Sequence, residues 1–361
     1  MSPVLSCFPL VKSRQADGSY DPSRWARQVR SFRIVPLLAV ATWWSFCETF
    51  PQANLLTTLS YVFPRLISFC IAPSLSIAIA RMIVYLSSRE ILSRRWTNTD
   101  ILRLTTWSTI GQTVPLLMVA ISIDFLRQHA FVGLIWLTSA APVALIATLR
   151  LRAAEGFKPH NVHSGELHKR AFVIAKRMGV RLRDVYVVPS GRGRITNAFG
   201  GIPRSIGVSD DYGKWLKGSQ LDFVVGHELA HIKQNHVLKE LALLPFLFCV
   251  IAGLGVALPR VPAVRSVLPF VAVFAPLLVF YFVSRRFEYA ADRIGVEIAG
   301  DVKAAVEALK SLHRHTQQAD EFSRIAELFS THPALSQRVN AIIALHPMDI
   351  RKASQSYQPV L

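Results

Sequence analysis

The stretch Gly226-His227-Glu228-Leu229-Ala230-His231 has a pattern typical of an α-helix, and the rest of the chain is organised around it. Two histidines four positions apart on a helix differ in direction by only about 40°, so both rings leave one face. This spacing suits two nitrogen ligands of one tetrahedral zinc ion. Glu228 points roughly 100° away from His227. It is therefore placed to take a proton from a zinc-bound water that attacks a carbonyl group.

The motif H-E-x-x-H is short, and the alternative to a zinc site is two surface histidines on an ordinary amphipathic helix. The residues before the motif favour a buried helix. Ser219 and Asp222, three positions apart, predict a capping box at the helix start. We expect the helix to run from about Gln220 to His236. The apolar residues that would bury it are Leu221, Phe223, Val224 and Val225.

His236 is a further histidine close to the motif. It lies five positions after His231, which is about 140° further round a continuous helix. In that direction it cannot share a metal with the histidine pair. We therefore expect His236 to contact a ligand side chain or to pack in the core.

A third protein ligand is needed, because a catalytic zinc site has three protein ligands and one open position. The downstream stretch Phe287-Glu288-Tyr289-Ala290-Ala291-Asp292 has a helical pattern, and Glu288 can supply the ligand. Asp292 lies one turn further on the same face, where it can accept the second N–H of a ligand histidine. The alternative is an ordinary helix that carries two acidic residues.

Four stretches of the chain together resemble the HtpX and CAAX prenyl endopeptidase family of membrane-integrated zinc metalloproteases. They occur in the family's order and cover roughly residues 155–345. The matching stretches are Asn197-Ala198-Phe199, His227-Glu228-Leu229-Ala230-His231, Glu288-Tyr289-Ala290-Ala291-Asp292, and Thr331-His332-Pro333-Ala334-Leu335 with Arg338.

The resemblance implies a role for each matched residue. His227, His231 and Glu288 would bind Zn²⁺, Glu228 would be the catalytic base, and Asp292 would orient a ligand histidine. His332 would lie near the active site, where it would hold Glu288 or the transition-state oxyanion. The 197–209 stretch, which begins with Asn197, Ala198 and Phe199, would form an edge strand that pairs with the substrate backbone.

Composition and charge indicate a membrane protein. Of the 361 residues, 51% are apolar and 18% are charged, and the formal net charge is +18. Because this basic excess accompanies long apolar segments, it indicates basic loops beside an anionic leaflet. We find no zinc-finger spacing and no aromatic-interleaved basic patch, so nucleic acid is not an expected partner. The four cysteines show no CxxC spacing and are expected to be neither disulfides nor ligands.

The sequence divides into five regions. Residues 1–33 are polar and basic, 34–150 hold four expected transmembrane helices, and 151–240 begin a zinc protease domain. Residues 241–284 form a transmembrane hairpin, and 285–361 complete the protease domain. The expected leading spans are 34–46, 63–86, 105–126 and 129–149. The alternative is that they are buried helices of a soluble bundle, but such helices usually carry a polar stripe, which these segments lack. Between 151 and 240 we expect strands over 184–188 and 204–209, with a turn at 197–201.

The distribution of basic residues predicts the orientation. Six spans place both termini on one side together with the protease domain, and that side carries most of the loop arginines. The positive-inside bias then places the zinc site in the cytoplasm, in a multi-pass protein of a bacterial inner or plasma membrane.

We therefore predict a mainly α-helical fold, with polytopic membrane helices and a cytosolic α+β zinc metalloprotease domain that holds a small β-sheet. The predicted function is that of an integral membrane zinc endopeptidase that hydrolyses peptide bonds through a zinc-activated water. Its partners would be the lipid bilayer and polypeptides, chiefly membrane-associated or misfolded proteins. Two alternatives remain: a maturation protease for a lipidated precursor, and a membrane sensor or receptor that signals through a zinc protease domain.

Overall fold

The computed structural model shows two compact units, and each is described here by itself. The helical unit holds most of the residues before 157 together with Leu241–Phe280, and the sheet unit holds mainly Phe157–Glu240 and Tyr281–Leu361. The structure describes residues 63–91, 94–154, 159–189, 198–201, 204–257, 262–316 and 327–345, together with Trp25, Val29, Leu38, Ala41, Thr42 and Ser45.

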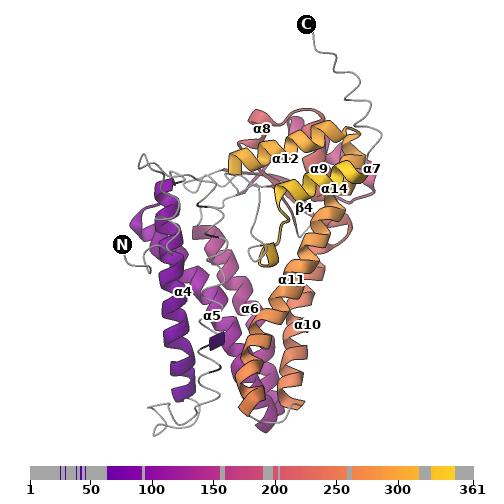
Figure 1. Ribbon diagram of the computed structural model, residues 1–361. Coiled ribbons are helices and arrows are strands. Elements are labelled where there is room, and N and C mark those ends of the chain that lie inside the picture. Colours follow the sequence, from indigo (N-terminus) through magenta and orange to yellow (C-terminus); the bar gives the residue numbers. More distant parts are fainter. Residues whose placement is uncertain are drawn as a thin grey trace. The chain divides into compact units, whose positions relative to one another are not determined.

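The helical unit is built from long apolar helices (Figure 1). They are α4 (Phe63–Ile91), α5 (Asn98–Gln128), α6 (Ala130–Ala154), most of α10 (His236–Ala257) and the first half of α11 (Pro262–Ala299). Helix α5 begins with a capping box in which Thr97 and Asp100 satisfy each other's backbone N–H groups. One buried cluster joins all five helices, with Ile77, Leu117, Leu137, Ile251 and Val273 among its members.

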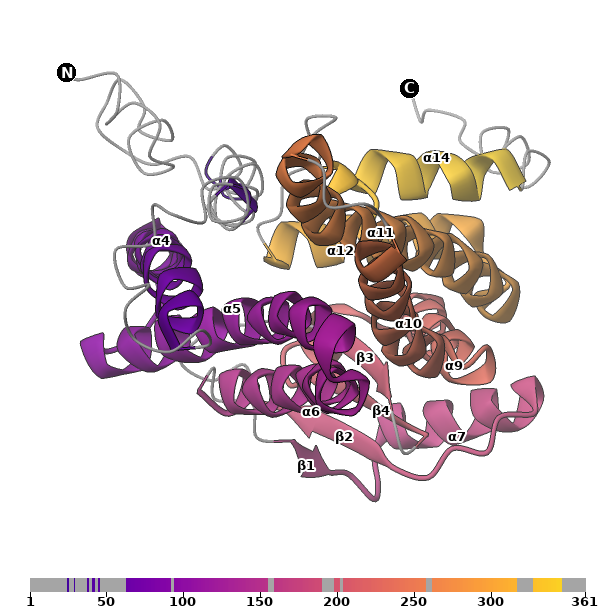
Figure 2. The ribbon, with the colours of Figure 1, turned by 90° about the horizontal axis from the view of Figure 1, so that it is seen from below.

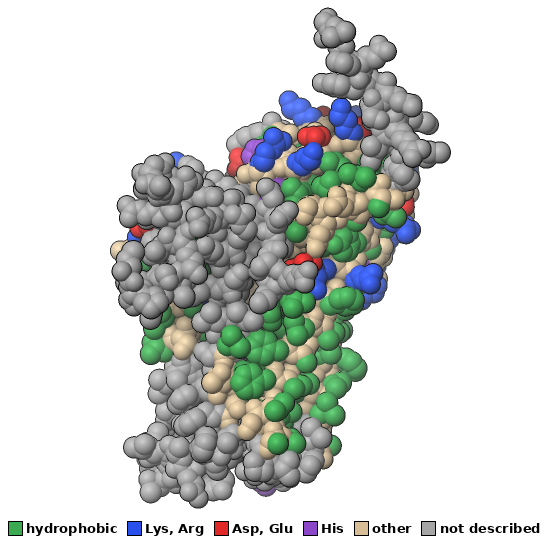
Figure 3. All heavy atoms as spheres, in the orientation of Figure 1, with side chains coloured by type: hydrophobic (Ala, Val, Ile, Leu, Met, Phe, Trp, Pro, Cys, Tyr) green, Lys and Arg blue, Asp and Glu red, His purple; other side chains and the backbone are tan. Residues whose placement is uncertain are grey.

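Three of the described helices are long and apolar enough to cross a membrane: Phe131–Ala154, His236–Leu254 and Ser266–Ala299. Hydrophobic side chains cover α10 and α11 in the space-filling view (Figure 3), and Phe246, Val267 and Phe282 are exposed among them. Helices α4 and α5 span the predicted segments 63–86 and 105–126, but they do not meet this criterion over their described residues. Most of the segment 34–46 lies outside the described residues, so the six-span topology stays a prediction.

Helix α11 is longer than the sequence pattern predicted. The expected hairpin helix ends near Val283, but α11 runs without a break from Pro262 to Ala299. The stretch Ser284-Arg285-Arg286 contains neither glycine nor proline, so nothing in it interrupts the backbone hydrogen bonds. One continuous helix therefore carries both a candidate membrane span and Glu288.

The sheet unit holds four short strands in the order β1-β2-β4-β3 (Figure 2). Strand β1 (His160–Asn161) pairs antiparallel with β2 (Val185–Val188), and β2 pairs parallel with β4 (Ser205–Ser209). Strand β3 (Ala198–Gly201) pairs antiparallel with β4 and forms the edge of the sheet. The strands predicted over 184–188 and 204–209 are confirmed. The turn predicted at 197–201 is wrong, because Ala198–Gly201 completes the sheet as a strand. The edge strand implied for 197–209 is present only as β3, since Ser205–Ser209 forms the interior strand β4.

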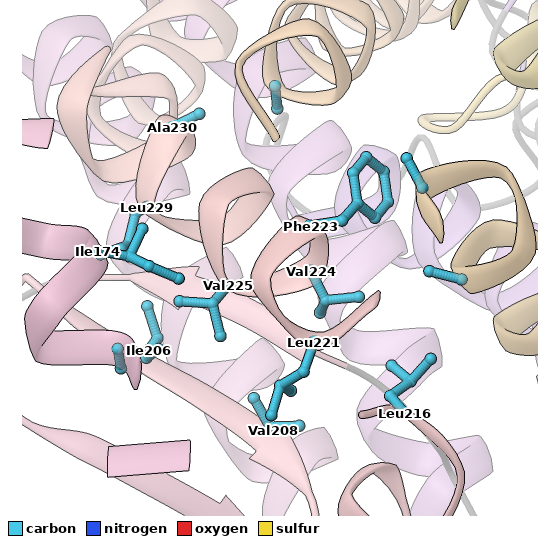
Figure 4. Close-up of a cluster of buried hydrophobic side chains, with 14 of the residues drawn as sticks. Ile174, Ile206, Val208, Leu216, Leu221, Phe223, Val224, Val225, Leu229 and Ala230 are labelled. Carbon is cyan, nitrogen blue, oxygen red and sulfur yellow. The ribbon is translucent and has the colours of Figure 1, made fainter. Parts of the chain in front are cut away.

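The same unit also holds five described helices in full. They are α7 (Glu166–Met178), α8 (Tyr212–Trp215), α9 (Ser219–Lys233), α12 (Val302–Thr316) and α14 (Leu335–Leu345). Figure 4 shows how Ile174 of α7, Ile206 and Val208 of β4, and Val225 and Leu229 of α9 pack into one core. All of these side chains are buried, so α9 is fixed along its length by apolar contacts.

The start of α9 differs from the prediction. The N-cap residue is Gly218, and no side chain caps the helix. The predicted capping box is therefore wrong, because Ser219 is already helical and Asp222 has another partner. Both carboxylate oxygens of Asp222 accept hydrogen bonds from Arg170 of α7, at 2.8 and 2.9 Å. This ion pair joins α7 to α9 beside the core.

The mainly helical fold with a small sheet is confirmed. The sheet is mixed, since it holds one parallel and two antiparallel pairings.

Candidate metal centre

Helix α9 presents the two predicted histidine ligands on one face. The Nε2 atoms of His227 and His231 are 3.2 Å apart. His227 and Glu228 are buried, and the neighbouring Leu229 and Ala230 belong to the core that fixes the helix. The four-residue spacing therefore produces the convergence that helix geometry predicts.

Helix α11 brings Glu288 to the same point. Its Oε2 atom is 3.7 Å from Nε2 of His227, and its Oε1 atom is 3.6 Å from Nε2 of His231. The two helices approach closely because each carries a glycine at the contact. A Cβ on Gly226 would lie 3.3 Å from the Cα of Gly295, so larger residues would push the helices apart.

These three residues fit a zinc ion. Zinc binds His nitrogen at about 2.0–2.1 Å, and tetrahedral geometry then separates two ligand atoms by about 3.3 Å. The three observed separations lie close to that spacing, and the ligand atoms all lie within 4.8 Å of one another. Among the described residues, the buried Oε2 of Glu288 has no hydrogen-bond partner, as expected of a ligand atom.

Asp292 fixes the ring of His227. Its Oδ1 atom is 2.9 Å from Nδ1 of His227. An ionised carboxylate can only accept hydrogen bonds, so Nδ1 carries the proton and Nε2 can direct a lone pair at the centre. Burial lowers the pKa of His227, but Asp292 and then Glu288 more than offset this and raise it overall. The surroundings thus favour a positive charge at this ring, which a bound cation also supplies.

Arg338 of α14 binds both acidic residues. Its Nε and Nη2 atoms donate to Oδ2 and Oδ1 of Asp292 at 2.7 and 2.6 Å, and its Nη1 atom is 3.4 Å from Oε2 of Glu288. Burial alone would lower the pKa of Arg338, but Asp292 raises it well above its usual range. Sequence reasoning included Arg338 in a matching stretch without giving it a role. Nothing in the local sequence around α14 signals this contact.

Glu228 lies beside the ligand pair and contacts the edge strand. The backbone N–H of Gly200 on β3 donates to its carboxylate. Burial raises the pKa of Glu228 to about 7 despite the opposing charge of His227. Gly200 allows the close approach, because a Cβ there would collide with the backbone oxygen of Glu228. A buried carboxylate with this pKa is suited to exchange a proton near neutral pH.

His231 differs electrostatically from His227. Burial, followed by the charge of His227, lowers the pKa of His231 to about 3. Its ring is therefore neutral at physiological pH, which is the form that binds a metal. The Nδ1 atom of His231 lies 2.9 Å from Nδ1 of His236, so the predicted contact between His236 and a ligand is present.

His332 lies at the exposed side of the centre. Its Nε2 atom is 3.5 Å from Oε1 of Glu288, and 59% of its side chain is exposed. The Thr331 hydroxyl lies 2.8 Å from its Nδ1 atom. Arg285 of α11 donates to the carbonyl oxygens of Glu327 and Ser330, and these bonds hold the segment that leads to His332.

The predicted substrate strand is described in part. Ala198 and Phe199 belong to β3 at the edge of the sheet, whereas Asn197 lies outside the described residues. Phe199 is opposite Gly207 of β4, and a Cβ on Gly207 would collide with the Phe199 ring. Their role in binding substrate stays a prediction.

Comparison with known proteins relates the chain to proteases. It is 29% identical over 187 residues to the Protease HtpX homolog of Methylibium petroleiphilum, covering 43% of this chain and 66% of that relative. It is 27% identical over 199 residues to the Protease HtpX homolog of Polynucleobacter necessarius subsp. necessarius, covering 46% and 68%. The chain thus spans about two thirds of the length of these curated relatives.

The fold also has a solved counterpart. The crystal structure of Ste24p from S. mikatae matches with a TM-score of 0.59 at 16% identity, over 89% of this chain and 86% of that one. At this identity the likeness concerns the fold. The sequence model of peptidase family M48 matches residues 161–346, which is just over half of the chain and includes every residue of the candidate centre. The chain therefore belongs to peptidase family M48.

Proposed function

We propose that the chain is an integral membrane zinc endopeptidase that hydrolyses peptide bonds of membrane-associated or misfolded proteins. One observation carries the proposal. Three ligand atoms with nearly tetrahedral spacing, from His227, His231 and Glu288, lie beside the buried carboxylate of Glu228. Membership of peptidase family M48 supports it.

The chain's own residues would divide the chemistry between them. A bound zinc ion supplies Lewis acidity, which polarises a carbonyl group and makes water more acidic. Glu228 would accept the proton of the attacking water and later donate it to the departing amine. Asp292 would keep the ring of His227 in place, and Arg338 would do the same for the carboxylate of Glu288, because each contacts that side chain directly. His332 would assist from the exposed side, either on Glu288 or on the oxyanion.

Strand β3 is proposed to hold the substrate backbone. It lies at the edge of the sheet, and Gly200 within it contacts Glu228. An extended peptide that pairs with this edge would therefore run close to the catalytic base. Ala198 and Phe199 would be its first contacts in the described part of the strand.

The position of the site along the chain supports a membrane substrate. Glu288 lies on α11, whose residues Ser266–Ala299 form a candidate membrane span, and another candidate span begins at His236, just after His231. Ligands so close in sequence to membrane helices suit cleavage at or near the bilayer surface. The positive-inside bias supports a cytoplasmic site in a bacterial inner or plasma membrane.

Two measurements test the proposal. Purified protein in detergent should cleave casein, lose that activity when a chelator removes zinc, and recover when zinc is returned. Membranes that contain the Glu228→Gln variant should retain uncleaved membrane proteins, which co-purify with the variant and can be identified by mass spectrometry. Casein cleavage that persists after complete removal of zinc would refute the proposal.

A further inference from the structure

We propose that His236 is a positioning residue of the metal centre, which accepts a hydrogen bond from His231 and fixes the tautomer in which Nε2 of His231 faces the metal. This inference rests on the proposed metal site. It is supported by two hydrogen bonds that connect the side chains of His231, His236 and Gln234 in a row. The Nδ1 atoms of His231 and His236 are 2.9 Å apart, and Nε2 of His236 is 2.8 Å from Oε1 of Gln234.

The proton positions in this row of hydrogen bonds follow from the groups at its two ends, His231 and Gln234. If Nε2 of His231 binds a metal, Nδ1 of His231 must carry the proton, so it donates to Nδ1 of His236. Nε2 of His236 then carries the other proton and donates to the side-chain oxygen of Gln234, which is an acceptor. Each bond thus has one donor and one acceptor, and reversing the first bond would require Nε2 of His231 to be protonated.

The backbone explains how a residue outside the ligand helix reaches the ligand. Helix α9 ends at Lys233, and Asn235 has a left-handed backbone with φ of 53°. Asparagine is one of the few residues other than glycine that adopts this conformation at low cost. The break allows His236 to begin α10 and to lie against His231, which a continuous helix would not permit.

The ring of His236 is also held from its other side. It stacks on Phe287 with the ring centroids 4.1 Å apart and the planes 7° from parallel. His236 is only 1% exposed, so little freedom remains for the ring to turn. Phe287 directly precedes Glu288. His236 therefore contacts both His231 and the residue next to the third proposed ligand.

The arrangement parallels that of the other ligand histidine. Asp292 accepts the Nδ1–H of His227, and His236 occupies the same position relative to His231. The acceptor is a carboxylate oxygen for His227 and an imidazole nitrogen for His231. Loss of such a partner typically costs about 10–100-fold in metal affinity or activity.

A set of substitutions separates the hydrogen bond from packing. His236→Phe keeps an aromatic ring for the stack on Phe287 but removes the acceptor. His236→Asn places an amide oxygen near the former Nδ1 position, and His236→Gln places its amide near the former Nε2 position. His315→Phe is the matched control, because His315 stacks on Trp215 with centroids 4.1 Å apart and lies on α12.

The readouts are the zinc dissociation constant, measured against a competing chelator, and the visible spectrum of the Co²⁺-substituted protein. We expect His236→Phe and His236→Gln to weaken zinc binding by about 10–100-fold and to change the Co²⁺ spectrum. His236→Asn should recover most of the affinity, and His315→Phe should match the unmodified protein. If His236→Phe does not fold, the comparison of Asn with Gln, which are both smaller than histidine, decides the question.

Each possible failure has a distinct meaning. Unchanged zinc affinity and Co²⁺ spectra in His236→Phe and His236→Gln would overturn the positioning role while leaving the metal site intact. Equal losses in the Asn and Gln variants would also overturn it, because the position of the acceptor would then not matter. Absence of zinc from the unmodified protein would overturn the proposed function, and this inference with it.

Discussion

His227 and Asp292 are 65 residues apart in the chain, yet Nδ1 of His227 lies 2.9 Å from Oδ1 of Asp292. Arg338 donates two hydrogen bonds to the same carboxylate. Side chains from three helices thus meet at the Asp292 carboxylate, and His227 and Asp292 are buried. This arrangement makes the outcome of several substitutions predictable.

The first prediction concerns the metal ligands. His227→Ala or His231→Ala removes one of three protein ligands, so each variant should lose its zinc during purification. The control is His163→Ala, because His163 is an exposed histidine of the sheet unit away from the centre. Metal analysis of the purified proteins checks the result. Stoichiometric zinc in both ligand variants would exclude these residues as ligands.

The second prediction concerns the pair formed by Asp292 and Arg338. Asp292→Asn and Arg338→Met should each lower zinc affinity by about 10–100-fold, because the ring of His227 loses its fixed orientation. The zinc affinity of the double variant should be little lower than that of the single variant with the lower affinity, since both changes break one network. Arg293→Met is the control, because the Arg293 side chain is exposed and pairs only with Glu297 among the described contacts. Additive losses in the double variant would argue against a shared network.

The third prediction concerns the contact between β3 and α9. Gly200→Ala adds a methyl group that collides with the backbone of Glu228, and such overpacking typically costs about 1–3 kcal/mol. The variant should lose casein cleavage more than zinc, because Glu228 moves while the ligands stay. Gly253→Ala is the matched control, since its added methyl group meets nothing within 4 Å. Full activity of Gly200→Ala would show that the contact is not needed.

The fourth prediction concerns orientation. A variant lacking the native cysteines and carrying Lys303→Cys, an exposed position of α12, should resist a membrane-impermeant thiol reagent in intact bacterial cells. Arg260→Cys, in the turn of the transmembrane hairpin predicted over 241–284 and thus on the side opposite to the protease domain, should react readily. Permeabilised cells provide the control for reactivity of both positions. The reverse labelling pattern would place the metal centre outside the cytoplasm.

The sequence predicted those parts of the centre that depend on local geometry. His227 and His231 follow from the period of a helix, and Asp292 follows from its place one turn after Glu288. The sequence could not show the role of Arg338, because a salt bridge across 46 residues leaves no local pattern. The break at Asn235, which lets His236 reach His231, was also missed, because the helix was expected to continue to His236 whereas it ends at Lys233.

Two errors in the fold have related causes. Ser219 and Asp222 have the spacing of a capping box, but the ion pair with Arg170 of α7 gives Asp222 a partner that only the folded unit provides. The stretch Ala198–Gly201 contains the glycines of a turn, yet it forms a strand because it pairs antiparallel with β4. In both places, tertiary contacts outweigh local propensity.

In the proposed mechanism, Glu228 acts as the base while His227, His231 and Glu288 hold the metal. Glu228→Gln keeps nearly the same volume and leaves His227, His231 and Glu288 unchanged, so the purified variant should retain about one zinc per chain. Loss of a general base typically lowers the rate by about 10²–10⁴-fold. Glu288→Gln, which removes an anionic ligand, should instead lose zinc and activity together. The decisive measurement is casein cleavage by zinc-loaded Glu228→Gln in detergent micelles. We expect a rate at least about a hundredfold below that of the unmodified protein. Near-normal cleavage with zinc in place would show that Glu228 is not the base.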